Sequence, residues 1–148
     1  MQRSGISHDE PCPVARCVDV IGDRWSLLIV RDCFDGLRRF GDLQRSLGVA
    51  RNILSDRLRK LVDAGILQLQ AASDGTAYQE YVLTAKGEAL FPIVVGLRQW
   101  GEQHLFARGE PRSLLVEKRT GKQIPLMAPT TKDGTVLTAS ATEVRKAK

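Results

Sequence analysis

The stretch VARNILSDRLRKLVDAGIL, from Val49 to Leu67, decides the fold and raises the question of function. Four of its apolar residues recur at helical spacing: Leu54, Leu58, Leu61 and Val62. This stripe predicts an amphipathic helix that buries one face. The opposite face carries polar side chains: Arg51, Asn52, Ser55, Asp56 and Arg59. Burial does not explain these polar residues, so their face is the candidate functional surface.

The positive charge of the chain is concentrated around this helix. Between Arg38 and Lys60 there are seven Lys or Arg and only two acidic residues, whereas the first 108 residues together have a net charge of +1. A basic run is often no more than a solvated helix face, so charge alone leaves two interpretations open. The order of the neighbouring elements has to decide between them.

Length and composition restrict the class of protein. The chain has 148 residues, 43% of them hydrophobic and 26% charged, which is typical of one soluble globular domain. No apolar run approaches the roughly 18 residues that span a bilayer, and the first residues lack the apolar core of a secretory signal. The three cysteines are an odd number, which favours reduced thiols over a disulfide framework. We therefore expect a cytoplasmic protein without a membrane partner.

The segments on either side complete a recognisable order of elements. Apolar spacing predicts helices over residues 13–21, 24–34 and 40–47, with Asp23 as a helix cap and glycines as stops. After the opening helix, ILQLQAA and AYQEYVL alternate around the Asp74-Gly75 turn, which predicts a hairpin. Thr84 is expected to cap a last helix over about residues 85–104, where Pro92 either kinks the helix or separates two helices. The fold class is therefore mainly α with a small β-wing, a winged helix-turn-helix.

Three regions are predicted along the chain. Residues 1–11 form a flexible N-terminal arm, residues 12–108 form the winged-helix and dimerisation domain, and residues 109–148 form an accessory extension with a basic tail. The extension is predicted to hold a β-hairpin around Thr120-Gly121 and a further strand after Asp133-Gly134. It contains no cysteine or histidine, so it is not expected to be a zinc site.

In a winged helix the outward face of the helix in the opening stretch, which ends at Gly65, would lie in the major groove of DNA. Arg51 can then donate two hydrogen bonds to a guanine edge, Asn52 can pair with adenine, and Ser55 and Asp56 follow one turn later. Five further basic residues are predicted to contact phosphates: Arg38, Arg39, Arg59, Lys60 and Lys86. The wing tip at residues 73–76 has no Lys or Arg, which predicts a weak contribution from the wing.

Several motifs in register resemble one family. CPVARC, GDRWSLLIVRD, RRFGDLQRSL, RNILSDRLRKLVDAGIL and YVLTAKGEALFPI, within residues 12–104, resemble the HxlR-type winged-helix regulators, relatives of the MarR group. The resemblance implies a small bacterial transcription regulator that binds inverted-repeat operators. It also implies homodimers built from the first and last helices.

Apolar residues near the chain's first and last helices are candidates for that dimer interface: Val14, Leu90, Ile93, Val94 and Leu97. The alternative is that they close the core of their own subunit. Trp25 and Trp100 stand among aliphatic residues and are interpreted as core, with a ligand cavity between subunits as the alternative.

Cys12 lies at the start of the first helix, where the helix dipole stabilises a thiolate. Some members of the family use a cysteine here as a sensor of oxidants or electrophiles, so Cys12 is a candidate redox sensor. The alternative is an inert cysteine near the dimer interface. Cys17 and Cys33 fall among apolar residues and are interpreted as core.

We expect a sequence-specific DNA-binding regulator, acting as a repressor, whose partners are double-stranded DNA, a second copy of the chain and a small-molecule or oxidant effector. One alternative is a winged-helix protein-interaction module that reads no bases. Another is a thiol enzyme around Cys12, but only His8 lies near it as a base. No catalytic motif, cofactor or metal is predicted, because paired carboxylates, phosphate loops and clustered ligands are missing from the sequence.

Overall fold

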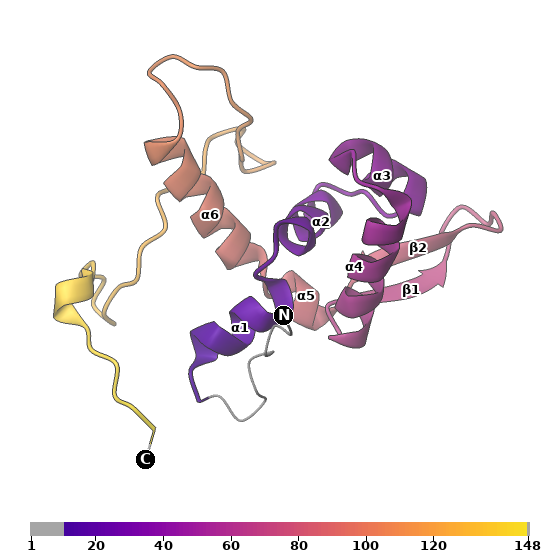
Figure 1. The fold of residues 1–148 in the computed structure, drawn as a ribbon. Helices are drawn as coiled ribbons and strands as arrows, with labels where there is room; N and C mark the ends of the chain where they lie inside the picture. Colours follow the sequence, from indigo (N-terminus) through magenta and orange to yellow (C-terminus); the bar gives the residue numbers. More distant parts are fainter. Residues whose placement is uncertain (1–10, 148) are drawn as a thin grey trace. The chain divides into compact units, whose positions relative to one another are not determined.

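The computed structural model describes residues 11–147 and divides the chain into two units, Met1–Pro92 and Ile93–Lys148. The predicted flexible arm, apart from Pro11, lies outside the described residues. The first unit holds α1 (Pro13–Ile21), α2 (Arg24–Phe34), α3 (Phe40–Leu47), α4 (Arg51–Asp63), β1 (Leu67–Ala71), β2 (Gln79–Leu83) and α5 (Ala85–Glu88), and the second holds nearly all of α6 (Phe91–His104) (Figure 1). No described helix is both long and apolar enough to cross a membrane.

The predicted helix boundaries arise from local chemistry. The Asp23 carboxylate accepts hydrogen bonds from the backbone nitrogens of Trp25 (3.1 Å) and Ser26 (3.0 Å), which caps α2. Gly48 ends α3 in the left-handed conformation, with φ of 61°, so the chain can turn directly into α4. The helix-turn-helix of the first unit therefore consists of α3, a short turn and α4.

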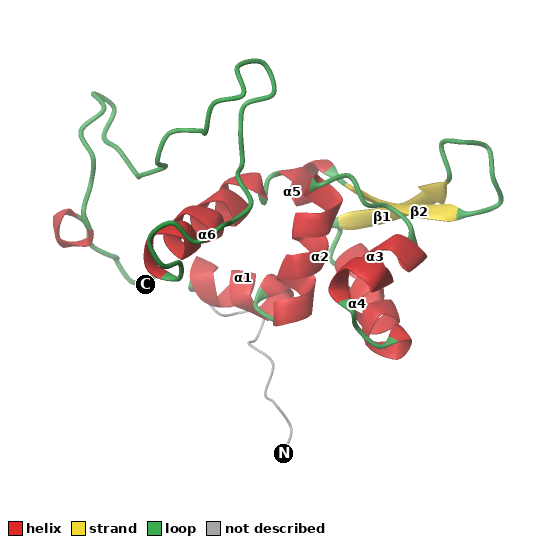
Figure 2. Cartoon of the chain, turned by 90° about the horizontal axis from the view of Figure 1, so that it is seen from above, coloured by secondary structure: helices red, strands yellow, loops and turns green. Residues whose placement is uncertain are grey.

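The core of the first unit lies where α2 packs against α3, α4 and β2. Fully buried apolar side chains come from α2, α3, α4 and β1: Ile29, Val30, Leu43, Leu54, Leu58, Leu61 and Leu67. Figure 2 shows α3 and α4 as adjacent helices, with the β1–β2 wing extending beyond them. Three of the four residues in the apolar stripe of α4 are thus buried as predicted, Val62 is half-buried, and the polar face points out of the core.

The wing is an antiparallel pair in which Leu67 faces Leu83 and Ala71 faces Gln79. Its loop spans residues 72–78 and is wider than the predicted four-residue turn. The buried Glu80 accepts hydrogen bonds from the backbone nitrogen and the hydroxyl of Ser73, both at 3.4 Å. The Glu80 carboxylate therefore pairs with the polar groups of Ser73, whereas in a tighter turn the backbone N–H would pair with another backbone group.

The predicted last helix is divided into α5 and α6, and Pro92 lies at the start of α6. Pro92 therefore marks two helices and does not kink one. It is the second residue of α6, where a missing N–H costs little because the first turn has no helical partner for it. The Thr84 hydroxyl caps α5 by accepting from the backbone nitrogen of Gly87 at 3.1 Å, as predicted.

The C-terminal segment, residues 105–147, differs from its predicted form. The expected strands are reduced to two single antiparallel bridges, Val116–Gln123 and Thr130–Val136, around glycine turns at the predicted positions. The side-chain amide of Gln99 on α6 contacts the backbone of this segment. Its nitrogen donates to the carbonyl of Pro125 at 3.0 Å and its oxygen accepts from the backbone nitrogen of Met127 at 2.8 Å.

Candidate nucleic-acid interface

A groove of about 660 Å³ lies between α3, the first turns of α4 and the wing. Its lining includes Arg39, Arg45, Arg51, Ser55, Tyr78 and Gln79. Two predicted base-reading residues, Arg51 and Ser55, are thus part of the groove, and Asn52 is exposed beside them on the first turn of α4. The groove combines cationic and hydrogen-bonding side chains on one concave surface.

Two arginines of the groove rest on aromatic rings. The Arg51 guanidinium carbon lies 4.8 Å from the centre of the Phe40 ring, and that of Arg39 lies 4.8 Å from the centre of the Tyr78 ring. Stacking of this kind contributes about 0.5–1 kcal/mol at exposed sites and leaves the donors at the edge of the guanidinium accessible. The rings therefore hold both arginines in a restricted orientation before any ligand binds.

Arg39 also forms an ion pair with Asp74 in the wing loop. The wing tip lacks its own cation, as the sequence indicates, but this contact brings a guanidinium from the start of α3 to it. Arg38 pairs with the buried Glu80 of β2 at 3.5 Å, and its backbone carbonyl accepts from the Tyr81 nitrogen at 2.8 Å. Both predicted phosphate ligands thus tie α3 to the wing.

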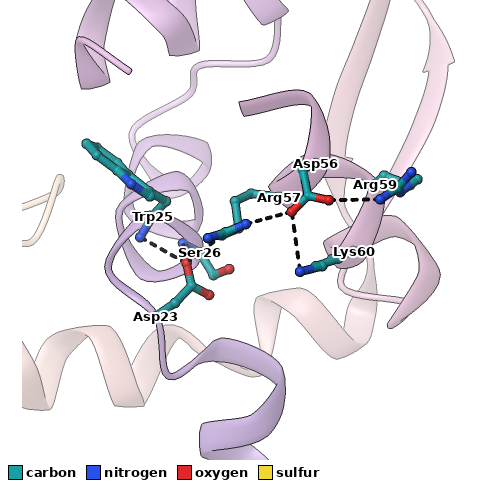
Figure 3. Close-up of polar contacts among 7 residues, drawn as sticks. All are labelled: Asp23, Trp25, Ser26, Asp56, Arg57, Arg59 and Lys60. Atoms are coloured by element: carbon teal, nitrogen blue, oxygen red, sulfur yellow. Dashed lines mark hydrogen bonds and ion pairs between the residues drawn. The ribbon is translucent and has the colours of Figure 1, made fainter. Parts of the chain in front are cut away.

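The Asp56 carboxylate contacts three cations of its own helix (Figure 3). It lies 2.6 Å from Arg57, 2.8 Å from Arg59 and 3.3 Å from Lys60. The hydrogen bond from Lys60 and the neighbouring positive charges lower the pKa of Asp56 below its ordinary value, so it is ionised at neutral pH. The prediction placed Asp56 beside Ser55 among the base readers, whereas the structure engages its carboxylate with these cations.

Arg57 joins this cluster to the helix cap. Its Nε donates to Asp23 at 3.0 Å while its Nη1 donates to Asp56 at 2.6 Å. Lys86, predicted as a phosphate ligand, donates from Nζ to the carbonyl of Ala64 at 2.6 Å, at the C-terminal end of α4. A cation at this position complements the helix dipole.

Arg51 differs from the other basic residues of the segment 38–60. Six of the seven form an ion pair with a carboxylate: Arg38, Arg39, Arg45, Arg57, Arg59 and Lys60. Within residues 11–147 no such carboxylate partner is found for Arg51, whose side chain stacks on Phe40 instead. Its donors at the groove are therefore not committed to an acid of the described chain.

The sequence analysis missed the aromatic residues of the groove. The alternating stretch AYQEYVL placed Tyr78 in a strand, but Tyr78 is an exposed loop residue beneath Arg39, and the half-buried Phe40 at the start of α3 lies beneath Arg51. Tyr78 and Arg39 are far apart in the sequence, so only the tertiary fold reveals their contact.

The cysteines lie away from the groove. Cys12 is exposed and occupies the cap position of α1, while Cys17 and Cys33 are half-buried. Burial, assisted by the charge of Asp32, raises the pKa of Cys33 to about 12, so its thiol is protonated and unreactive at neutral pH. No group of three or more His, Cys, Asp or Glu in the described part of the chain could hold a metal ion.

The candidate interface residues of α1, of α6 and of the turn before α6 are partly accessible. Val14, Ile93 and Leu97 are exposed, whereas Leu90 and Val94 are half-buried. Trp100 is 58% exposed, so its interpretation as a core residue is wrong. Ile93, Leu97 and Trp100 follow one another at helical spacing and form an apolar stripe on α6.

These features define a winged helix-turn-helix protein with a basic groove between α3, the start of α4 and the wing. The chain belongs to the HxlR-like helix-turn-helix family, whose sequence profile matches residues 20–108. It is similar to the HTH-type transcriptional regulator Rv3095 of Mycobacterium tuberculosis, with 44% identity over 106 residues that cover 71% of this chain and 67% of Rv3095. The chain is thus a transcriptional regulator with a helix-turn-helix fold.

Solved structures support the same assignment. The crystal structure of PA1607, described as a candidate transcription factor, matches with a TM-score of 0.89 and 50% identity and covers 94% of this chain and 97% of PA1607. The reduced form of the redox regulator HypR matches with a TM-score of 0.58 and 32% identity over 64% of this chain and 94% of HypR. The PA1607 match is long enough to include most of the C-terminal segment, whereas the HypR match is not.

Proposed function

We propose that the chain is a sequence-specific repressor that binds an inverted-repeat operator as a homodimer in the cytoplasm. The observation that carries this proposal is the state of Arg51. It lines the groove, rests on Phe40 and pairs with no carboxylate of the described chain. A guanidinium held in this way can donate two hydrogen bonds to a guanine edge in the major groove.

The remaining polar side chains take complementary roles. Asn52 and Ser55 lie on the same face of α4 and contact bases next to the Arg51 position. Arg38, Arg39, Arg59, Lys60 and Lys86 contact phosphates, which fixes the register of the protein on the duplex. Asp56 holds Arg57, Arg59 and Lys60 in place and reduces their attraction for DNA of any sequence.

A homodimer follows from the small size of one reading surface. One helix in one major groove reads only a few base pairs, and two related helices about 34–36 Å apart would match two half-sites one turn apart. The apolar stripe Ile93, Leu97 and Trp100 on α6 and the exposed Val14 on α1 offer an interface of the kind that oligomers bury. Such a dimer on a promoter would block the polymerase sterically.

The signal in this proposal acts through Cys12 or a small ligand by changing the spacing of the two reading helices. Cys12 is exposed at the start of α1, and the similar protein HypR is a redox regulator. Cys33 is a poor alternative because burial keeps its thiol protonated.

The competing function is a protein-interaction module that reads no bases. A winged helix can serve this way, since a fold does not fix a function. The polar composition of the groove favours DNA, because the fully buried centre of a protein interface is depleted in charged residues.

The proposal is tested by gel shift with the genomic region upstream of the gene, at fixed salt and with excess random DNA, before and after diamide treatment. The expected result is a complex that survives the competitor. Loss of this complex on oxidation, and its retention in Cys12→Ser, would assign the signal to Cys12. Fragments can also be obtained by genome-wide selection. If random DNA competes away the complex with every such fragment, the protein-interaction module is the better explanation.

A further inference from the structure

Arg57 is the most buried of the three cations that contact Asp56. Its side chain is 27% exposed, whereas the side chains of Arg59 and Lys60 are 69% and 63% exposed. Arg59 and Lys60 are therefore accessible to phosphates, while Arg57 is held against the protein. Its guanidinium lies between the carboxylate of Asp23 at the cap of α2 and that of Asp56 on α4 (Figure 3).

A single oxygen atom of Asp23 joins Arg57 to the cap. Asp23 Oδ2 accepts from the backbone nitrogens of Trp25 at 3.1 Å and Ser26 at 3.0 Å. The same oxygen accepts from Arg57 Nε at 3.0 Å. Ser26 is buried, so the first turn of α2 holds this carboxylate in a fixed place. A change at the cap therefore acts directly on Arg57.

The other end of Arg57 shares an acceptor with an exposed cation. Arg57 Nη1 and Lys60 Nζ lie 2.6 and 3.3 Å from Asp56 Oδ2. Arg59 contacts the second oxygen, Oδ1, at 2.8 Å. A stronger attraction between Arg57 and Asp56 holds this carboxylate at the expense of Lys60, because the two cations compete for one atom. The division of Arg57 between its two acids thus affects how far the exposed cations of α4 are neutralised.

We propose that Arg57 is a positioning residue that makes the affinity of α4 for DNA depend on the cap of α2. The inference rests on the proposed function and deepens it. While the Asp23 carboxylate balances Arg57, Asp56 remains available to Arg59 and Lys60. When Asp23 loses its charge, Arg57 turns to Asp56. The two exposed cations are then less neutralised and attract the phosphates of any DNA more strongly.

The test measures the affinity for a random duplex at fixed salt. Asp23→Asn is made in the wild type and in two backgrounds, Arg57→Gln and Asp56→Asn, each of which removes one link between the cap and the exposed cations. Asp63→Asn is the matched control, because it removes the same charge from an exposed position of α4. Asparagine also caps helices, so α2 should remain formed, which circular dichroism checks. Asp23→Ser, a second capping residue without charge, serves if Asp23→Asn does not fold.

The expected result is a coupling that needs both links. In the wild type, Asp23→Asn should raise the affinity about threefold more than Asp63→Asn does. In the Arg57→Gln and Asp56→Asn backgrounds, Asp23→Asn should have no larger effect than the control.

The results that would overturn the inference can be told apart. If Asp23→Asn acts equally in all backgrounds, or no more than Asp63→Asn in the wild type, the cap does not act through Arg57. An effect lost in Arg57→Gln but kept in Asp56→Asn would show that Arg57 contacts DNA itself. In these cases a wild-type complex with a selected fragment that survives random DNA leaves the proposed function standing. A wild type that binds no DNA would refute both.

Discussion

At the scale of single residues, we propose that Asp56 sets how strongly α4 attracts DNA. One carboxylate faces Arg57, Arg59 and Lys60 within 3.3 Å, so the cations of this helix are partly neutralised before DNA arrives. Affinity for random DNA depends on the number of phosphates that the protein neutralises, which makes it sensitive to salt. Asp56 therefore favours sequence discrimination by weakening contacts that every DNA sequence offers.

Replacing Asp56 by asparagine should strengthen binding to all DNA. Without the carboxylate, Arg59 and Lys60 are no longer partly neutralised and attract phosphates more strongly, and the slope of log K against log salt should steepen by about one. The measurement is the affinity for a random duplex at several salt concentrations. Asp133→Asn is the control, because it removes the same charge from an exposed turn of the C-terminal segment. An unchanged slope in Asp56→Asn would show that these cations do not meet phosphates.

The sequence predicted the positions of the proposed reading residues on α4, but not the contacts that support them. Helical spacing is enough to place Arg51, Asn52 and Ser55 on one face of α4, because all three lie on a single helix. The contacts of Arg39 with Asp74 and Tyr78 join residues that are 35 or more positions apart, so no local pattern encodes them. The role of Asp56 was missed for another reason, since an acid on a polar helix face fits base reading and ion pairing equally well.

At the scale of elements, the cap of α2 links stability to pH. Burial raises the pKa of Asp23, but hydrogen bonds from Ser26 and the guanidinium of Arg57 outweigh it and leave the pKa below its ordinary value. A carboxyl of this kind stabilises the fold above the pKa of the unfolded chain, about 4, and loses that contribution as the pH falls through the folded pKa. Unfolding free energy should thus decrease below about pH 4.

Asp23→Asn separates the cap from the charge. Asparagine is a good cap, so α2 should remain formed while the attraction for Arg57 is lost. Urea unfolding between pH 3 and pH 7 should show a smaller pH dependence for the variant than for the wild type. Asp63→Asn, at an exposed position of α4, should retain the wild-type dependence. Equal pH profiles for Asp23→Asn and the wild type would contradict the role given to Asp23.

Gly87 permits the close approach of α5 to the backbone of Ile66, just before β1, and to the side chain of Leu83 in β2. A Cβ atom there would lie 2.2 Å from the carbonyl oxygen of Ile66 and 3.0 Å from a methyl group of Leu83. Gly87→Ala should therefore lower the free energy of unfolding by about 1–3 kcal/mol through overpacking. Gly101→Ala is the control, since a Cβ atom there meets nothing within 4 Å and helix propensity should add up to about 1 kcal/mol. Urea denaturation distinguishes the two, and equal stability of both variants would refute the steric argument.

The elements also show where sequence patterns stop. Caps and glycine stops predicted the helices of the first unit, because those signals act over a few residues. The strands predicted in the C-terminal segment are reduced to two single bridges, and a local pattern does not encode contacts with another element such as those of Gln99 with Pro125 and Met127. The prediction that Trp100 lies in the core was wrong because apolar spacing identifies the apolar face of a helix but not what packs against that face.

At the scale of the whole molecule, Arg51 differs from the other basic residues of the segment 38–60 in how its charge is paired. Six of the seven basic residues between Arg38 and Lys60 are paired with acids, which suits contacts that need only hold the phosphate backbone. Arg51 stacks on Phe40 at the groove instead. The central claim is that this residue reads a base while residues such as Arg59 provide affinity for any sequence.

The most direct test compares Arg51→Ala with Arg59→Ala on a DNA fragment selected for tight binding by the full chain and on random DNA, at several salt concentrations. We expect Arg51→Ala to cost about 1–3 kcal/mol on the selected fragment, to relax specificity there and to change random binding little. Arg59→Ala should weaken both complexes by the same factor and flatten the salt slope by about one. If the two variants lost the same affinity on both DNAs, Arg51 would not be a reading residue and the central claim would be wrong.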